Sequence, residues 1–179
     1  MKKHFMLDLE TMGLQPNAAV TAIGIAYFDR DNILDTFYTP VSLEDCKNVG
    51  LVTLKSTEDW WAKQSPEARA AWDVENPPSV LESLGAMAKW MRSHSTEKDI
   101  APWGNGSDFD LVLMASMCRA VEVETPWKYY NHHCFRTMKN IFKVAEELRT
   151  GIYHHALDDA VTQAKHLQKI LKVHCIDLP

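Results

Sequence analysis

Residues 4–10 alternate between two kinds of side chain, and this pattern restricts the fold more than any other in the chain. Phe5, Leu7 and Leu9 alternate with Met6, Asp8 and Glu10. A period of two predicts a β-strand that carries Asp8 and Glu10 on one face. Asp is disfavoured inside strands. A solvated edge strand would explain the two acids, but the apolar residues around them favour a buried strand.

Two further strands are predicted after this one, over Val20–Phe28 and residues 33–39. The segment between them, residues 29–32, consists of Asp, Arg and Asn, which include typical turn residues. Residues 13–19 contain Gly and Pro and predict another turn. Connections this short predict an antiparallel meander of three strands.

Helices are predicted for most of the remaining chain. Their expected positions are residues 56–64, a short segment from Ser65, a longer one from Ser79, and residues 109–121, 136–148 and 157–171. Short strands are expected over residues 100–103 and 127–130. This order predicts an α/β fold in one domain, residues 1–179. Its mixed sheet would have three antiparallel strands plus two parallel ones, with helices on both faces.

The composition restricts the class of partner and the compartment. The 179 residues carry a net charge of −5, which does not suit a protein that coats nucleic acid but allows an enzyme that grips a few nucleotides. The four cysteines are scattered, so a zinc ribbon or disulfide framework is not expected. The chain starts without the apolar stretch of a signal peptide, and no run approaches the length of a membrane span. We therefore expect a cytoplasmic protein with no membrane partner.

A histidine and two acids mark the start of the last predicted helix. His154 and Asp159 are five residues apart, which on a continuous helix would separate them by about 140°. They can face one site if His154 lies in the preceding loop and Asp159 in the first helical turn. Asp158 is explained by the helix dipole, which favours negative charge at this end. Asp159 precedes apolar residues and is predicted to be a ligand, whereas His155 is expected to be solvated or to support the site.

A third acidic segment precedes the helix predicted from residue 109. Asp108 fits the N-cap position, and Asp110 lies two residues further on. One of them is expected to cap the helix and the other to serve as a ligand.

Acids from three separate segments need a reason to lie together. Two carboxylates about 5 Å apart repel each other by about 3 kcal/mol at an effective dielectric constant of about 20. Bound cations remove this repulsion, and ligand sets made only of oxygen suit Mg²⁺ or Mn²⁺. The pattern therefore indicates a metal-dependent phosphodiester hydrolase.

The order and spacing of these segments resemble those of the DEDDh exonucleases of the DnaQ-like superfamily. The matching motifs are Asp8-Leu9-Glu10-Thr11-Met12-Gly13, Phe109-Asp110 and His154-His155-Ala156-Leu157-Asp158-Asp159-Ala160. The segments Trp60–Ser65, Trp103–Gly106 and Arg136-Thr137 look like the phage-type exonucleases and the mycobacterial-type exoribonuclease subgroup. The resemblance selects Asp110 as the middle ligand. In the family an Asn usually stands four residues before this Asp, whereas Asn105 stands five before Asp110, so Asp108 remains an alternative.

The resemblance implies a ribonuclease H-like fold with two Mg²⁺ or Mn²⁺ ions per active site. Asp8 would bridge the ions, and Glu10 and Asp159 would complete the site of the attacking water. Asp110 would support the second ion. His154 would take the proton of the water, as a histidine can near neutral pH.

The resemblance also implies the substrate and the residues that bind it. The substrate would be the 3′ end of single-stranded DNA or RNA, cleaved to nucleoside 5′-monophosphates. Leu9, Thr11 and Phe109 would contact the terminal nucleotide, and Trp61 and Gln64 are further candidates, although tryptophans at helical spacing more often belong to the core. The alternatives are an RNA-specific trimming exoribonuclease and a catalytically inactive binding module. The chain is also a candidate homodimer.

Overall fold

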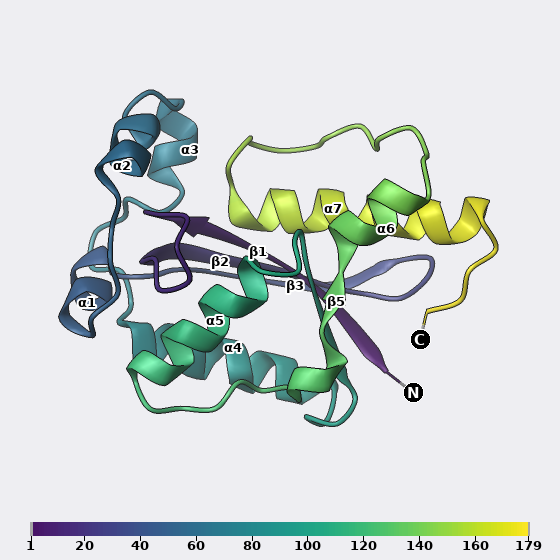
Figure 1. Ribbon diagram of the computed structural model, residues 1–179, viewed down its shortest axis with the longest axis horizontal. Helices are drawn as coiled ribbons and strands as arrows, with labels where there is room; N and C mark the ends of the chain where they lie inside the picture. Colours follow the sequence, from purple (N-terminus) through teal and green to yellow (C-terminus); the bar gives the residue numbers. More distant parts are fainter. Residues whose placement is uncertain (1, 179) are drawn as a thin grey trace.

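The computed structural model describes residues 2–178 and contains one five-stranded sheet in the order β3-β2-β1-β4-β5 (Figure 1). The strands β1 (Lys3–Thr11), β2 (Val20–Phe28) and β3 (Ile33–Pro40) form an antiparallel meander, as the sequence predicts. The strand β4 (Ile100–Gly104) lies parallel to β1, and β5 (His133–Cys134) lies parallel to β4. The expected mixed sheet is therefore confirmed, and the first strand lies at its centre.

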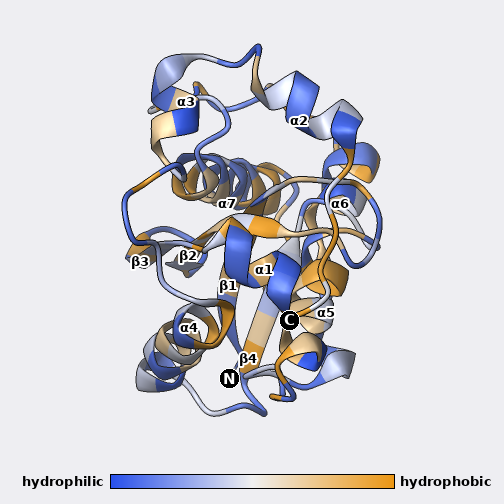
Figure 2. Ribbon diagram, turned by 90° about the vertical axis from the view of Figure 1, so that its left-hand side faces the viewer, coloured by the Kyte–Doolittle hydropathy of each residue, from blue (hydrophilic) through white to orange (hydrophobic). Residues whose placement is uncertain are grey.

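Helices cover both faces of this sheet (Figure 1). On one face lie α4 (Val80–His94) and α5 (Asp110–Ala120), and on the other lie α6 (Phe135–Ile141) and α7 (Ala156–Val173). Three short helices, α1 (Leu43–Asn48), α2 (Lys55–Trp61) and α3 (Pro66–Ala70), lie beyond the meander, and Tyr129–Asn131 forms a 3₁₀ turn. Figure 2 shows that α4 and α7 carry both hydrophilic and hydrophobic residues, as expected for helices that cover a sheet. Within residues 2–178, none of the helices combines the length and apolar character that crossing a membrane requires.

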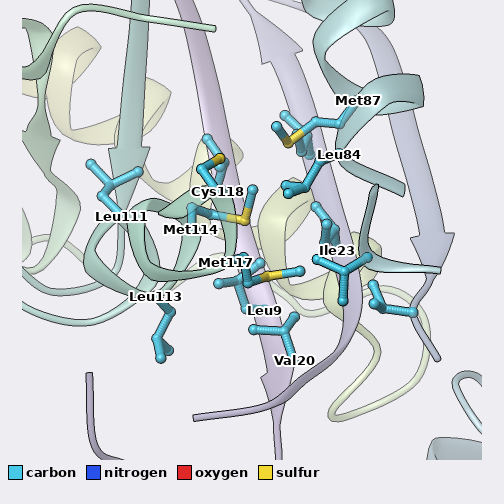
Figure 3. Close-up of a cluster of buried hydrophobic side chains, with 14 of the residues drawn as sticks. Leu9, Val20, Ile23, Leu84, Met87, Leu111, Leu113, Met114, Met117 and Cys118 are labelled. Carbon is cyan, nitrogen blue, oxygen red and sulfur yellow. The ribbon is translucent and has the colours of Figure 1, made fainter. Parts of the chain in front are cut away.

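The two faces of β1 enter two separate apolar clusters. Phe5, Leu7 and Leu9 pack with β2, α4 and α5, while Met6 packs with the apolar face of α7. Figure 3 shows the first cluster, to which Met87 of α4 and Met114 and Met117 of α5 belong. The helix predicted from Ser79 is confirmed: its apolar residues Val80, Leu84, Met87 and Met91 are buried, and a capping box between Ser79 and Glu82 begins it.

The helix α7 comes very close to the sheet at Gly24 of β2. A Cβ atom at this position would collide with the backbone of Ala156 and Leu157, at the first turn of α7. Gly24 pairs with Asp8 across the β1–β2 ladder. The missing side chain therefore lets the start of α7 lie directly against β2, next to Asp8 of the neighbouring strand β1.

Two predicted elements are wrong. The helix expected over residues 136–148 ends at Ile141. Beyond it, Phe142 and Val144 pack against the second apolar cluster, whereas Leu148 is 91% exposed, so the buried residues alternate as in an extended chain and do not form a helical stripe. The strand expected over residues 127–130 is replaced by the 3₁₀ turn, and the pairing strand follows at His133–Cys134. The buried side chain of Asn131 accounts for this shift, because its amide donates to the carbonyls of Lys98 and Ile100, both at 3.0 Å.

Candidate active site

Three carboxylates meet where β1 approaches the first turn of α7. Asp8 and Glu10 project from β1, and Asp159 projects from α7. One oxygen of each lies within 4.8 Å of an oxygen of the other two. The structure therefore brings together three of the acids that the sequence selects, from segments about 150 residues apart.

The N-terminus of α7 is held by the residues just before and within it. The backbone N–H of Asp158 donates to Nδ1 of His155, which is the N-cap, and the Asp158 carboxylate accepts a hydrogen bond from the N–H of Ile152 at 2.8 Å. His155 also stacks on the ring of Tyr38, with centroids 4.7 Å apart. Asp159 thus lies in the first turn and His154 in the preceding loop, as their spacing predicts.

Asp110, rather than Asp108, lies beside this group. Asp110 is the first residue of α5 and is 2% exposed, whereas Asp108 is exposed. The Asp110 carboxylate accepts a hydrogen bond from the N–H of Asn105 at 2.8 Å, and its charge acts on Asp8. The N-cap of α5 is Phe109, so the expected capping role of Asp108 is wrong.

Burial and mutual repulsion change the ionisation of these acids. Burial, together with the charges of Asp110, Glu10 and Asp159, raises the pKa of Asp8 well above its ordinary value. Burial and the charge of Asp159 raise the pKa of Glu10 to about 8, and burial raises the pKa of Asp110 to about 6. The cluster therefore binds protons when no other cation neutralises it.

The donor set of this cluster fits a divalent cation. All of its ligand atoms are carboxylate oxygens, which Mg²⁺ and Mn²⁺ prefer. One of them, Oε1 of Glu10, is buried without a hydrogen-bond partner among the described residues. A bound cation would satisfy this oxygen and remove the repulsion.

Two polar residues that sequence reasoning missed also touch the cluster. Gln163 donates from Nε2 to Oδ1 of Asp8 at 2.6 Å, and Arg149 forms an ion pair with Asp159. Gln163 follows Asp159 by four residues and so lies on the same face of α7, a spacing from which its position near the cluster could have been predicted. Arg149 lies in a segment without regular structure, where spacing carries no such signal.

His154, two residues before the start of α7, has an unusual backbone conformation. Its φ of +60° is in the left-handed region, and its side chain is half-buried. The ring packs edge-to-face against Trp60, with centroids 4.8 Å apart, and also meets Trp61 at 6.2 Å. Strain of this kind often persists where a side chain must be aimed at a site.

A pocket of about 440 Å³ opens next to Glu10. Its lining residues come from β1, the turn after β1, α2 and the start of α5: Leu9, Glu10, Thr11, Leu14, Ser56, Thr57, Trp60, Trp61 and Phe109. We call this the terminal pocket. It includes four of the five residues predicted to contact substrate, and its size is typical of small-molecule sites.

The remaining predicted contact, Gln64, is not among the lining residues of the terminal pocket. Its side-chain amide donates back to the carbonyl of Trp60 at 3.1 Å. Trp61 is only 3% exposed, and its Nε1 donates to the backbone carbonyl of Thr11 at 2.9 Å. Trp61 therefore forms the wall of the pocket and fixes the end of β1, while Trp60 is the more exposed of the two indoles, at 41%.

Solved structures with this fold are nucleases. The nuclease domain of 3′hExo, a DEDDh family member bound to rAMP, aligns with a TM-score of 0.67 at 15% identity, over 97% of this chain and 94% of that one. The zinc-bound form of the Escherichia coli ExoI–ssDNA complex aligns with a TM-score of 0.54 at 14% identity, over 97% of this chain and 41% of that one. The fold is ribonuclease H-like, and the family match over residues 3–171 makes the chain a DnaQ-like 3′–5′ exonuclease of the DEDDh class.

Sequence comparison identifies the family within this class. The chain belongs to the family described as the 3′-5′ exoribonuclease Rv2179c-like domain, whose model matches residues 3–171. It is also 26% identical over 170 residues to the exodeoxyribonuclease of enterobacteria phage T4, covering 82% of this chain and 74% of that protein.

The raised pKa values predict that the metal-free protein loses stability as the pH rises. For Glu10, the folded state keeps its proton up to about pH 8, whereas in the unfolded state the ordinary value is 4.5. The stabilising contribution is therefore complete below pH 4.5 and is lost as the pH rises toward 8, and Asp8 and Asp110 act in the same direction. In EDTA, the melting temperature should fall by about 5 °C or more between pH 5.5 and 8.5.

Mn²⁺ should cancel this fall, so that the stabilisation by metal is larger at pH 8.5 than at pH 5.5. Thermal scans with EDTA and with Mn²⁺ at both pH values measure the difference. The variant Glu10→Gln, which lacks one of the ionising groups, serves as the control and should show a smaller fall in EDTA. Equal melting temperatures at the two pH values in EDTA would contradict the proposed repulsion.

Proposed function

We propose that the protein degrades single-stranded DNA or RNA from the 3′ end and releases nucleoside 5′-monophosphates, using two divalent metal ions. The observation that carries this proposal is the position of the acid cluster at the edge of the terminal pocket, with Glu10 belonging to both. A terminal nucleoside in the pocket would place its 5′-phosphate at the carboxylates. The intact set of acids argues against an inactive binding module.

The metal site would consist of Asp8, Glu10, Asp159 and Asp110. Bound ions would polarise the phosphate, promote ionisation of the attacking water and stabilise the leaving 3′-oxygen. Gln163 orients Asp8 through its hydrogen bond to Oδ1. The ion pair with Asp159 holds the Arg149 guanidinium near the acids. Burial and Asp159 raise the pKa of Glu10, and the positive charge of Arg149 partly counters this rise.

The end of β1 would recognise the terminal nucleoside. Leu9 and Phe109 offer apolar surface to the base. The Thr11 hydroxyl donates its proton to the Gly13 carbonyl at 2.9 Å, which leaves its oxygen free to accept a hydrogen bond from the terminal 3′-hydroxyl. A nucleotide inside a strand has no free hydroxyl at this position, so this contact favours cleavage from the 3′ end.

Degradation of labelled oligonucleotides tests the proposal. With Mg²⁺ or Mn²⁺, a 3′-labelled single strand should release labelled mononucleotide first, and EDTA should abolish the release. Internal products, or activity that resists EDTA, would contradict it. Matched DNA and RNA strands, each single-stranded and in a duplex, separate a general exonuclease from an RNA-specific trimming enzyme, because only RNA offers a 2′-hydroxyl. The family description favours RNA, whereas the phage relative is an exodeoxyribonuclease.

The two candidate middle acids form a matched pair for mutagenesis. Asp110→Asn should lower kcat by about 10³-fold or more, because it removes a buried negative charge at the metal site. Asp108→Asn, an identical chemical change at an exposed neighbour, should leave kcat within about twofold. Steady-state degradation of the same oligonucleotide measures both. A large loss in Asp108→Asn with little effect of Asp110→Asn would reverse the assignment.

His154 is proposed to take the proton from the attacking water through an imidazole nitrogen, held in place by the face-to-edge contact with Trp60. His154→Ala should lower kcat by about 10²- to 10⁴-fold, the usual contribution of a general base. Binding of Mn²⁺, measured by calorimetry, should change little. His155→Asn is the control, because Asn keeps the N-cap acceptor of α7 and should retain activity. Wild-type kcat in His154→Ala would exclude the role.

The cytoplasmic location, the single domain and the homodimer expected from the sequence stay predictions.

A further inference from the structure

A second pocket adjoins the acid cluster between α6, α7 and the segment that joins them. In Figure 1 this segment, residues 142–155, arches over α7. The pocket measures about 450 Å³, and Asp159 of the cluster lines it. None of its described lining residues belongs to the terminal pocket. The clustered acids therefore lie between two separate pockets, with Glu10 in one and Asp159 in the other.

The chemistry of the second pocket differs from that of the terminal pocket. Lys139 and Arg149 supply positive charge, and Tyr153 adds an aromatic ring over which the Arg149 guanidinium lies at 4.1 Å. Three of its polar atoms are buried and have no hydrogen-bond partner among the described residues: Nε of Arg149, Oε1 of Gln163 and Nε2 of His166. His166 is only 5% exposed. Buried polar atoms without partners are costly, and a ligand that reached them would offset this cost.

The acids that line this pocket are already paired. Glu147 pairs with Lys169 at 3.1 Å, and Asp159 belongs to the metal site. Glu146 pairs with Lys139 at 3.2 Å, but the Glu146 side chain is 75% exposed, and such a surface pair is weak enough to exchange for a phosphate. Metal binding at Asp159 would also compete with its ion pair to Arg149 and so free the guanidinium.

We propose that this second pocket binds the nucleotide on the 5′ side of the scissile bond, with its phosphodiester held by Lys139 and Arg149. The proposal rests on the proposed exonuclease function. With the terminal nucleoside in the first pocket and the scissile phosphate at the acids, the strand continues over Asp159 into a pocket that carries the charge and hydrogen-bonding atoms a sugar-phosphate needs. We call it the upstream pocket.

Two substrates separate the upstream pocket from the rest of the site. The first is a single-stranded octanucleotide, which should occupy both pockets. It is made of DNA or of RNA, whichever the wild-type protein degrades. The p-nitrophenyl ester of the matching nucleoside 5′-monophosphate keeps the terminal nucleoside and the phosphate but replaces the upstream nucleotide with nitrophenol. A residue of the upstream pocket should therefore matter for the octamer and not for the ester.

Lys139→Gln and Lys169→Gln form a matched pair of variants. Lys139 pairs with Glu146, and Lys169 pairs with the adjacent Glu147. Of the two lysines, only Lys139 lines the upstream pocket. Lys139→Gln should raise KM for the octamer about threefold to fivefold, the effect of losing one exposed charge contact, with kcat unchanged. It should leave hydrolysis of the ester unchanged, and Lys169→Gln should alter neither substrate.

Binding provides a readout without catalysis. In Ca²⁺, fluorescence anisotropy of the labelled octamer gives the dependence of affinity on salt. The slope of log K against log salt should become shallower by about 0.7 in Lys139→Gln and stay unchanged in Lys169→Gln. Equal slopes in all three proteins, or equal kinetic effects of Lys139→Gln on both substrates, would overturn the upstream pocket. A wild type that binds the octamer but cleaves neither substrate would instead overturn the proposed function, and the slopes would still test the pocket.

Discussion

The repulsion among buried carboxylates is the constraint on which the rest of this structure depends. Acids from β1, α5 and α7 are brought so close together that the charges of Asp110 and Asp159 raise the pKa of both Asp8 and Glu10. At an effective dielectric constant of about 20, one pair near 5 Å costs about 3 kcal/mol, a large fraction of the stability of a typical domain. Two apolar clusters on opposite faces of β1 provide the opposing stabilisation. The chain thus uses its best-packed region to hold its least favourable charges together.

The surroundings of the acids are divided into two chemically different regions. The terminal pocket is lined largely by Leu, Trp and Phe side chains, whereas the upstream pocket is lined by a lysine, an arginine, three acids and several polar side chains. A nucleic acid strand has a similar division at its end, because the last nucleoside carries a base and a free hydroxyl and the following linkage carries a charge. Under the proposed function, this asymmetry would give a bound strand one preferred direction. Glu10 and Asp159 mark the boundary between the regions.

The parts of the fold that sequence reasoning could predict are those set by local periodicity. The alternation around Asp8 predicts β1, the stripe from Val80 predicts α4, and the spacing of His154 and Asp159 predicts the start of α7. The three acidic motifs predict the cluster because a ligand set must converge, whatever path the chain takes between its members. The local pattern does not separate Asp110 from Asp108; the family resemblance favours Asp110, and the burial of Asp110 agrees with that choice.

The parts that could not be predicted depend on contacts between distant residues. Asn131 moves the last strand by bonding to carbonyls near β4, and no local pattern announces such a bond. The segment after Ile141 has the composition of a helix, but the two apolar residues that pack against the core, Phe142 and Val144, lie two apart and not at helical spacing. Arg149 reaches Asp159 from that irregular segment, and the role of Trp61 is set by a hydrogen bond to Thr11, 50 residues away.

Gly24 gives the spacing of the acids an unexpected origin. It has no functional group, yet α7 lies against the sheet at this point only because nothing projects from the residue. Any larger residue would lift the beginning of the helix and carry Asp159 away from the strand below. The spacing of the acids is thus set by a single hydrogen atom, at a position where every other amino acid carries a carbon atom.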